Sequence, residues 1–92
     1  MADITDNKPL SRYEMAVDDS VAFVEYERRP GAIVLVHTEV PDVLSGRGIG
    51  SKLAKSVLDR VRDEGAQVVP RCEFIASYIE RHPEYLEMVA EQ

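Results

Sequence analysis

The sequence has little that would stabilise it covalently or anchor it to a membrane. Its 92 residues include one cysteine, Cys72, and two histidines, His37 and His82. One cysteine excludes an intramolecular disulfide, and no Cys/His spacing resembles a zinc site, so we expect no bound metal. No apolar run approaches the roughly 20 residues of a membrane span, and the N-terminus lacks the basic and apolar parts of a signal peptide. These absences predict a cytoplasmic protein with no membrane partner.

Basic residues are also scarce, except in one stretch. The chain has 11 Lys and Arg against 17 Asp and Glu, for a net charge of −6. This balance argues against nucleic acid as a partner and favours a cationic one, such as an amine or a basic protein segment. Residues 47–62 are the exception, with five basic residues and one acidic residue. A positive island on an acidic protein suits a polyanionic ligand, although Arg60 and Arg62 also fit an ordinary solvated helix face.

The first half of the chain has the patterns of β-strands. Residues 1–10 are polar and without a period, which predicts a flexible tail before a single domain over residues 11–92. Alternating and β-branched residues then predict strands at Arg12–Val17, Val21–Arg28 and Ala32–Val40. Because the connections between them are short, we expect a three-stranded antiparallel meander.

The spacing of apolar residues changes from a strand pattern to a helical one after the third predicted strand. Apolar residues at every fourth position predict a helix over residues 48–64, which Gly65 ends as a left-handed cap. Ala66–Pro70 is too short for anything but a strand. A strand, a helix and a strand in succession imply a right-handed crossover, so this strand is expected to run parallel to Ala32–Val40.

A second helix is predicted after this strand. Apolar residues from Phe74 to Ile79 have helical spacing, and Pro83 ends the helix near His82. Residues 84–89 allow one more short helical stretch. The predicted fold class is therefore α+β, with a mixed sheet.

A glycine-rich turn, Ser45-Gly46-Arg47-Gly48-Ile49-Gly50-Ser51-Lys52, precedes the first predicted helix. Its glycines allow backbone to approach a ligand closely, and the helix start presents free N–H groups and the positive end of a dipole. This is the architecture of a phosphate-binding site, and the alternative is a flexible connection. The turn is not a Walker loop, because Leu53 follows Lys52, and Ser51 occupies the third glycine position of a dinucleotide fingerprint.

Four short blocks along the chain resemble those of the GNAT superfamily of acyl-CoA-dependent N-acetyltransferases. The blocks are His37–Pro41, Gly46–Ser51, Val69–Cys72 and His82–Tyr85. Together they look like the minimal single-domain branch of the superfamily, the YjdJ-type proteins, and the resemblance covers roughly residues 11–90. It implies a minimal GNAT fold, acetyl-CoA as the cofactor, and transfer of an acetyl group to an unknown primary amine.

The resemblance leaves the acceptor and the catalytic competence open. The amine belongs to a small molecule or to a protein, and the expected assembly is a monomer or a weak homodimer. The competing hypothesis is a binding module that holds coenzyme A or a partner protein with little or no turnover.

In this superfamily the glycine turn binds the pyrophosphate of coenzyme A, and pantetheine lies between two splayed strands. The resemblance thus assigns cofactor binding to eight residues. They are Thr38, Val40, Arg47, Gly48, Ile49, Gly50, Ser51 and Lys52. Ser45 departs from the superfamily pattern, which has Gln or Arg at that position, and the resemblance suggests that Arg47 and Lys52 supply the missing charge.

Two candidates for catalysis lie at the end of the third predicted strand. Related enzymes often take their general base from this region, so Glu39 is the first candidate and His37 the second. Strand alternation places both on the same face as Leu35. The alternative for His37 is a structural histidine bonded to backbone.

Two further candidates follow the fourth predicted strand. Cys72 ends that strand, where the resemblance places the thioester, as a nucleophile that forms an acetyl-cysteine or as a proton donor to coenzyme A. Tyr78 stands near the position at which many relatives have a tyrosine that protonates the thiolate. The alternatives are an inert, half-buried cysteine and a core tyrosine.

Overall fold

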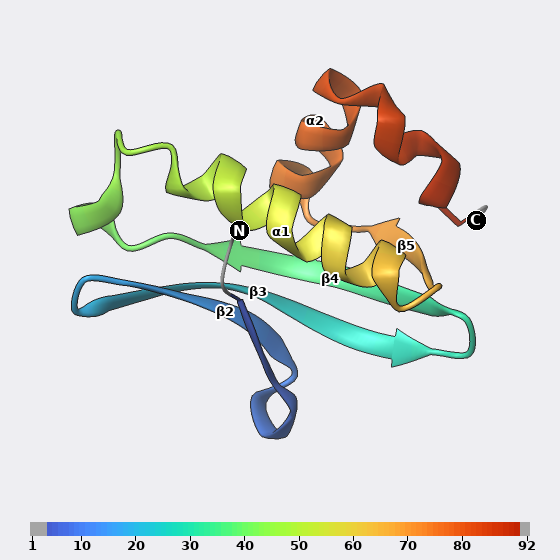
Figure 1. Cartoon of the computed structure of the whole chain (residues 1–92), viewed down its shortest axis with the longest axis horizontal. Helices are drawn as coiled ribbons and strands as arrows, with labels where there is room; N and C mark the ends of the chain where they lie inside the picture. The colour runs from blue at the N-terminus through green and yellow to red at the C-terminus, as the bar shows by residue number, and fades with distance from the viewer. Residues whose placement is uncertain (1–3, 91–92) are drawn as a thin grey trace.

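A five-stranded mixed sheet and two helices make up the computed structural model, which describes residues 4–90 (Figure 1). The strands are β1 (Thr5–Asn7), β2 (Arg12–Val17), β3 (Ser20–Arg29), β4 (Ala32–Glu39) and β5 (Gln67–Pro70), in that order across the sheet. The helices are α1 (Ile49–Asp63) and α2 (Glu73–Arg81), with 3₁₀ turns η1 (Lys8–Leu10), η2 (Asp42–Leu44) and η3 (Pro83–Met88). Strands β1 to β4 pair antiparallel and β5 pairs parallel to β4.

These elements confirm the predicted meander, crossover and α+β class. The five predicted segments from Arg12 to Pro70 end within one residue of the observed strands and of α1. The last helical stretch is the 3₁₀ turn η3, and beyond it Val89 bridges to Val68 at the free edge of β5.

Residues 5–10 are not a flexible tail, contrary to the prediction. Thr5–Asn7 pairs with β2 as an edge strand, and η1 follows with the Leu10 N–H bonded to the Asn7 side chain at 3.2 Å. Residues 1–3 lie outside the described residues. The segment has no apolar period, so a pattern of hydrophobic residues does not reveal it.

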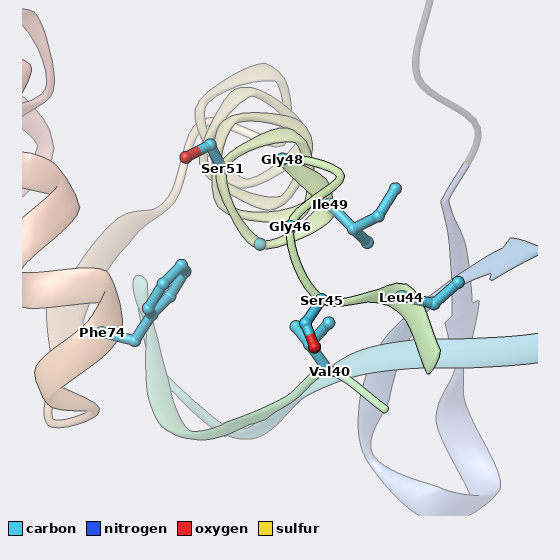
Figure 2. Close-up of a pocket in the computed structure, with 9 residues that line it drawn as sticks. Val40, Leu44, Ser45, Gly46, Gly48, Ile49, Ser51 and Phe74 are labelled. Carbon is cyan, nitrogen blue, oxygen red and sulfur yellow. The ribbon is translucent and has the colours of Figure 1, made fainter. Parts of the chain in front are cut away.

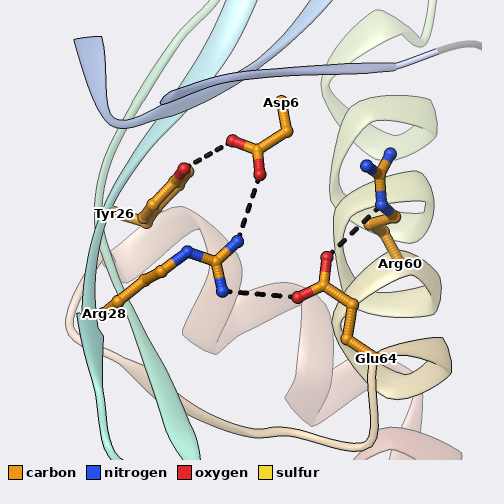
Figure 3. A network of polar contacts seen from close by, with 5 residues as sticks. All are labelled: Asp6, Tyr26, Arg28, Arg60 and Glu64. Atoms are coloured by element: carbon orange, nitrogen blue, oxygen red, sulfur yellow. Dashed lines mark hydrogen bonds and ion pairs between the residues drawn. The ribbon is translucent and has the colours of Figure 1, made fainter. Parts of the chain in front are cut away.

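A polar network attaches β1 to the rest of the molecule (Figure 3). The Asp6 carboxylate, whose side chain is only 4% exposed, accepts hydrogen bonds from the Tyr26 hydroxyl and from Arg28, the latter at 3.1 Å. Arg28 also reaches Glu64, directly after α1, at 3.4 Å, and Glu64 pairs with Arg60. Charged side chains therefore connect β1, β3 and the end of α1.

One core cluster joins the helices to one face of the sheet. The apolar face of α1 is buried as its period predicted, and it packs with the inward residues of β2, β3 and β4, including Tyr13, Val24 and Leu35. Ile75 and Ile79 of α2 belong to the same cluster. Apart from the fully buried Val34, the opposite face of β2, β3 and β4 carries mostly polar or partly exposed side chains, as expected where helices cover an antiparallel sheet on one side.

A β-bulge interrupts the pairing of β4 with β3. Tyr26 pairs with Leu35 and Glu25 pairs with His37, so Val36 is an extra residue on β4. Such an insertion shifts the alternation of side chains along the strand. Leu35 points into the core, whereas His37 shares the outer face with Glu25.

Candidate functional site

Strands β4 and β5 part after four paired residues. The pairing ends at Leu35 and Pro70, and the N–H groups of Arg71 and Cys72 then both donate to the Leu35 carbonyl, at 3.1 and 3.0 Å. Strand β4 continues beside β3 as far as Glu39. In the part of the chain that the structure describes, the other edge of β4 therefore has no strand partner beyond Leu35. An open backbone edge of this kind can pair with an extended ligand.

The glycine turn connects this end of β4 to α1. Leu44 is buried and fixes the turn to the core, while Gly46 and Gly48 adopt left-handed backbone, with φ of 78° and 71°. Gly48 is the N-cap of α1 and provides no side-chain cap, and the first turn of the helix contains no acidic residue. The first-turn N–H groups, which have no acceptor within the helix, are thus available to an anion.

Glycine is suited to positions 48 and 50 for different structural reasons. A side chain at position 48 would meet no atom within 4 Å, so glycine serves there for its positive φ. Gly50 lies inside α1, and a Cβ there would lie 2.7 Å from Cζ of Phe74. Its place in the sequence predicted only close approach of a ligand, whereas the structure shows a side chain of the protein against it.

A groove of about 290 Å³ lies between the glycine turn and α2 (Figure 2). Nine residues line it: Val40, Leu44, Ser45, Gly46, Gly48, Ile49, Gly50, Ser51 and Phe74. Five of the eight predicted cofactor residues are among them, whereas Thr38, Arg47 and Lys52 are not. Phe74 was not predicted as a site residue, because its spacing in the sequence indicated only the apolar face of a helix. Its place two residues after Cys72 was the available signal.

Two basic side chains near the turn are accessible to solvent. Arg47 pairs with Asp18, in the β2–β3 hairpin, at 2.8 Å, and its side chain stays about half exposed. Lys52 is exposed on α1. A negative charge on the hairpin therefore holds the Arg47 guanidinium of the turn.

Thr38 and Cys72 meet where β4 and β5 part. The Thr38 hydroxyl lies 3.1 Å from Sγ of Cys72, which is half-buried at the N-cap of α2. Thr38 pairs with the buried Val24 and thus belongs to the core-facing side of β4. The sequence predicted both residues as site residues but not their contact, which depends on where β5 ends.

His37 and Glu39 also form a pair, on the opposite side of β4. Nε2 of His37 lies 2.8 Å from Oε1 of Glu39, and both side chains are a little over half exposed. The prediction that they share the face of Leu35 is wrong, because the bulge at Val36 shifts the alternation. The His37 ring bonds a carboxylate rather than the backbone group that the alternative interpretation expected.

Tyr78 lies in the core. Its ring is 4% exposed and stacks on His82, with centroids 3.9 Å apart. Burial raises the pKa of Tyr78, and nearby Lys55 partly opposes the shift. Nδ1 of His82 bonds the Tyr78 carbonyl at 2.8 Å, near the end of α2. These contacts match the core alternative for this tyrosine.

Two other features are absent from residues 4–90. No three His, Cys, Asp or Glu side chains there gather as metal ligands would. None of the helices in that range has the length and apolar character needed to cross a membrane.

Known proteins resemble this chain in sequence over about three quarters of its length. Protein NATD1 of Xenopus tropicalis is 39% identical over 72 residues, which cover 76% of this chain and 65% of that protein. The human NATD1 protein is 40% identical over 72 residues, which cover 76% and 63%. The chain thus spans less than two thirds of the length of these relatives.

A solved structure has the same fold. The solution NMR structure of a GCN5-like protein from Staphylococcus aureus superposes with a TM-score of 0.72 over 99% of this chain and 90% of that chain, at 23% identity. Residues 12–88 match the family model described as GCN5-related N-acetyl-transferase. That range contains the bulge, the parted strands and the glycine turn. The chain therefore belongs to the GCN5-related N-acetyltransferase family.

Proposed function

We propose that this protein binds acetyl-CoA and transfers the acetyl group to a primary amine. The observation that carries the proposal is the parting of β4 from β5, on the strand whose end leads through the glycine turn to the uncapped start of α1. The first feature suits an extended arm and the second suits phosphate, and coenzyme A contains both. Family membership supports the same cofactor.

The residues present fit this cofactor. The N–H groups of the first turn of α1 would hold the pyrophosphate, with Arg47 and Lys52 adding positive charge from the exposed side. The open edge of β4 would pair with the pantetheine arm. The thioester would then lie towards Cys72, where the two strands part.

The chemistry requires a neutral amine, and we assign its deprotonation to Glu39 and His37. Nε2 of His37 lies 2.8 Å from Oε1 of Glu39, so the imidazole and the carboxylate can act together as the general base that takes the proton from the amine. The amine nitrogen then bonds to the carbonyl carbon, the C–S bond breaks, and the thiolate of coenzyme A takes a proton. The pair is accessible from solvent, as an acceptor amine requires.

Cys72 has two possible roles. As a proton donor it would protonate the departing thiolate, and the Thr38 hydroxyl at 3.1 Å would orient its thiol. As a nucleophile it would take the acetyl group from coenzyme A and pass it to the amine, so that one C–S bond replaces another before the C–N bond forms.

Calorimetry with acetyl-CoA and with coenzyme A tests the proposed cofactor. We expect saturable binding of both, and an absence of binding would refute the proposal. Mass spectrometry after mixing with acetyl-CoA then separates the two routes. An adduct on Cys72 of about 42 Da, one acetyl group, indicates the covalent route. Acetylation of an amine in a substrate panel without such an adduct indicates direct transfer.

A coenzyme A-binding module is the second candidate function. The observation that favours it is the exposure of His37 and Glu39, which lie on an outer face of the sheet rather than in an enclosed acceptor pocket. Binding of coenzyme A without an acetylated amine in any panel would support this candidate.

A further inference from the structure

Phe74 occupies the end of the groove nearest α2. Its side chain extends from the first turn of α2 towards the start of α1, and its ring lies against Gly50 (Figure 2). A methyl group at position 50 would lie 2.7 Å from Cζ and 3.4 and 3.5 Å from the two Cε atoms, so the ring points its edge at the helix. The side chain is 37% exposed, which leaves it a free direction in which to turn.

The glycine at position 50 makes this contact possible. Inside a helix, glycine is less favourable than alanine by about 1 kcal/mol. Of the five glycines, Gly50 alone would place a Cβ within 4 Å of another group, and that group is the Phe74 ring. At this position α1 is thus covered by an aromatic side chain rather than by backbone.

The ring is also one wall of the groove that begins at the glycine turn. The free N–H groups are at the start of α1, and Cys72 is two residues before Phe74 and does not line the groove. A ligand arm that follows the groove from the glycine turn towards α2 would therefore contact the ring.

We propose that Phe74 gates the groove: its ring packs on Gly50 in the free protein and turns outward to admit the pantetheine arm of an acyl-CoA. The proposal rests on the proposed function, because it takes the coenzyme as the ligand. With a gate of this kind, the observed association rate constant equals that of the open protein multiplied by the fraction of molecules in which the gate is open.

NMR on the wild-type protein tests the gate directly. An aromatic ring shifts the resonances of protons that lie against it, so the Gly50 α-protons should differ between the wild type and Phe74→Leu. On addition of coenzyme A, we expect the nuclear Overhauser contacts between Gly50 and the Phe74 ring to disappear. Contacts that are absent in the free protein, or that persist in the bound one, would overturn the gate.

Stopped-flow kinetics supply a second test. Phe74→Ala should raise the association rate constant for acetyl-CoA by about threefold to tenfold, because the variant has no closed state. Leu86→Ala is the matched control, since Leu86 is an exposed apolar residue on η3 that does not line the groove. An association rate constant that is unchanged or lower in Phe74→Ala contradicts the proposal.

The two proposals fail in different ways. If coenzyme A shifts none of the amide resonances of residues 46–51, the proposed function is wrong and the gate has no ligand. If those amides shift while the Gly50–Phe74 contacts persist, coenzyme A binds and only the gate is wrong.

Discussion

Gly48 allows a prediction in which stability and affinity move in opposite directions. The residue is the N-cap of α1, has a φ of 71°, and has no neighbour within 4 Å of a Cβ. Gly48→Asp and Gly48→Asn therefore fit sterically, and both residues tolerate left-handed backbone better than most. The two variants share shape and backbone strain, so that a comparison between them isolates the charge.

The expected magnitudes follow from the position at the helix start. A carboxylate near the N-terminus of a helix is stabilising by about 0.3–1 kcal/mol, so Gly48→Asp should unfold at a higher urea concentration than Gly48→Asn. The same carboxylate repels a phosphate. Two like charges at about 4 Å repel by about 1 kcal/mol in water and about 4 kcal/mol near a protein surface. An intermediate value, a loss of about 2 kcal/mol in binding free energy, corresponds to roughly 30-fold weaker binding of coenzyme A.

Urea unfolding followed by circular dichroism measures the first quantity, and calorimetry with coenzyme A at low salt measures the second. The difference in affinity should shrink as salt rises, because ions screen the repulsion. Equal affinities of the two variants at low salt would show that the phosphates do not bind at the start of α1, and the site built on the glycine turn would be refuted.

Three further predictions concern stability and are measured by urea unfolding. Gly50→Ala should stabilise Phe74→Ala by about 1 kcal/mol, because the helix gains alanine without a clash, and should stabilise the wild type by less, because the Phe74 ring must turn away from the new methyl group; an equal gain in both backgrounds would contradict the contact. Arg28→Met should cost about 2 kcal/mol, since it leaves a nearly buried carboxylate without its cation, and a loss below about 0.5 kcal/mol would count against that network. Burial alone would raise the pKa of Asp59, but hydrogen bonds from Lys55 and Tyr85 bring it below the ordinary value of 3.8. The contribution of ionised Asp59 to the free energy of unfolding is thus present above about pH 4 and is lost as the pH falls through the folded pKa. Asp59→Asn should therefore weaken the fall in stability at acid pH, and an unchanged fall would refute this assignment.

Much of the fold could be predicted from the sequence because each element has a strong local signal. The four-residue period of α1 and the apolar run of β4 depend only on neighbouring residues, and both were predicted within one residue. The edge strand β1 was not predicted, since Asp6 holds it through residues 20 and 22 positions away. Long-range polar contacts leave no period in a sequence.

The candidate site could be predicted in its composition but not in its arrangement. The glycine turn, Glu39 and Cys72 were identified from the sequence alone. The bulge at Val36, which places His37 and Glu39 on the outer face, depends on how β3 and β4 pair. The contact between Thr38 and Cys72 depends on where β5 leaves the sheet.

The sequence by itself determined the order of the elements, the glycine turn at the start of α1 and the family to which the chain belongs. Those features depend on neighbouring residues or on the order of motifs, and both can be read directly from the sequence. Only the tertiary structure decided which face of β4 carries each candidate side chain, that Asp18 holds Arg47, and that the Phe74 ring lies on Gly50. The physical reason is that packing and strand register bring together residues far apart in the chain, and one inserted residue is enough to reverse a face.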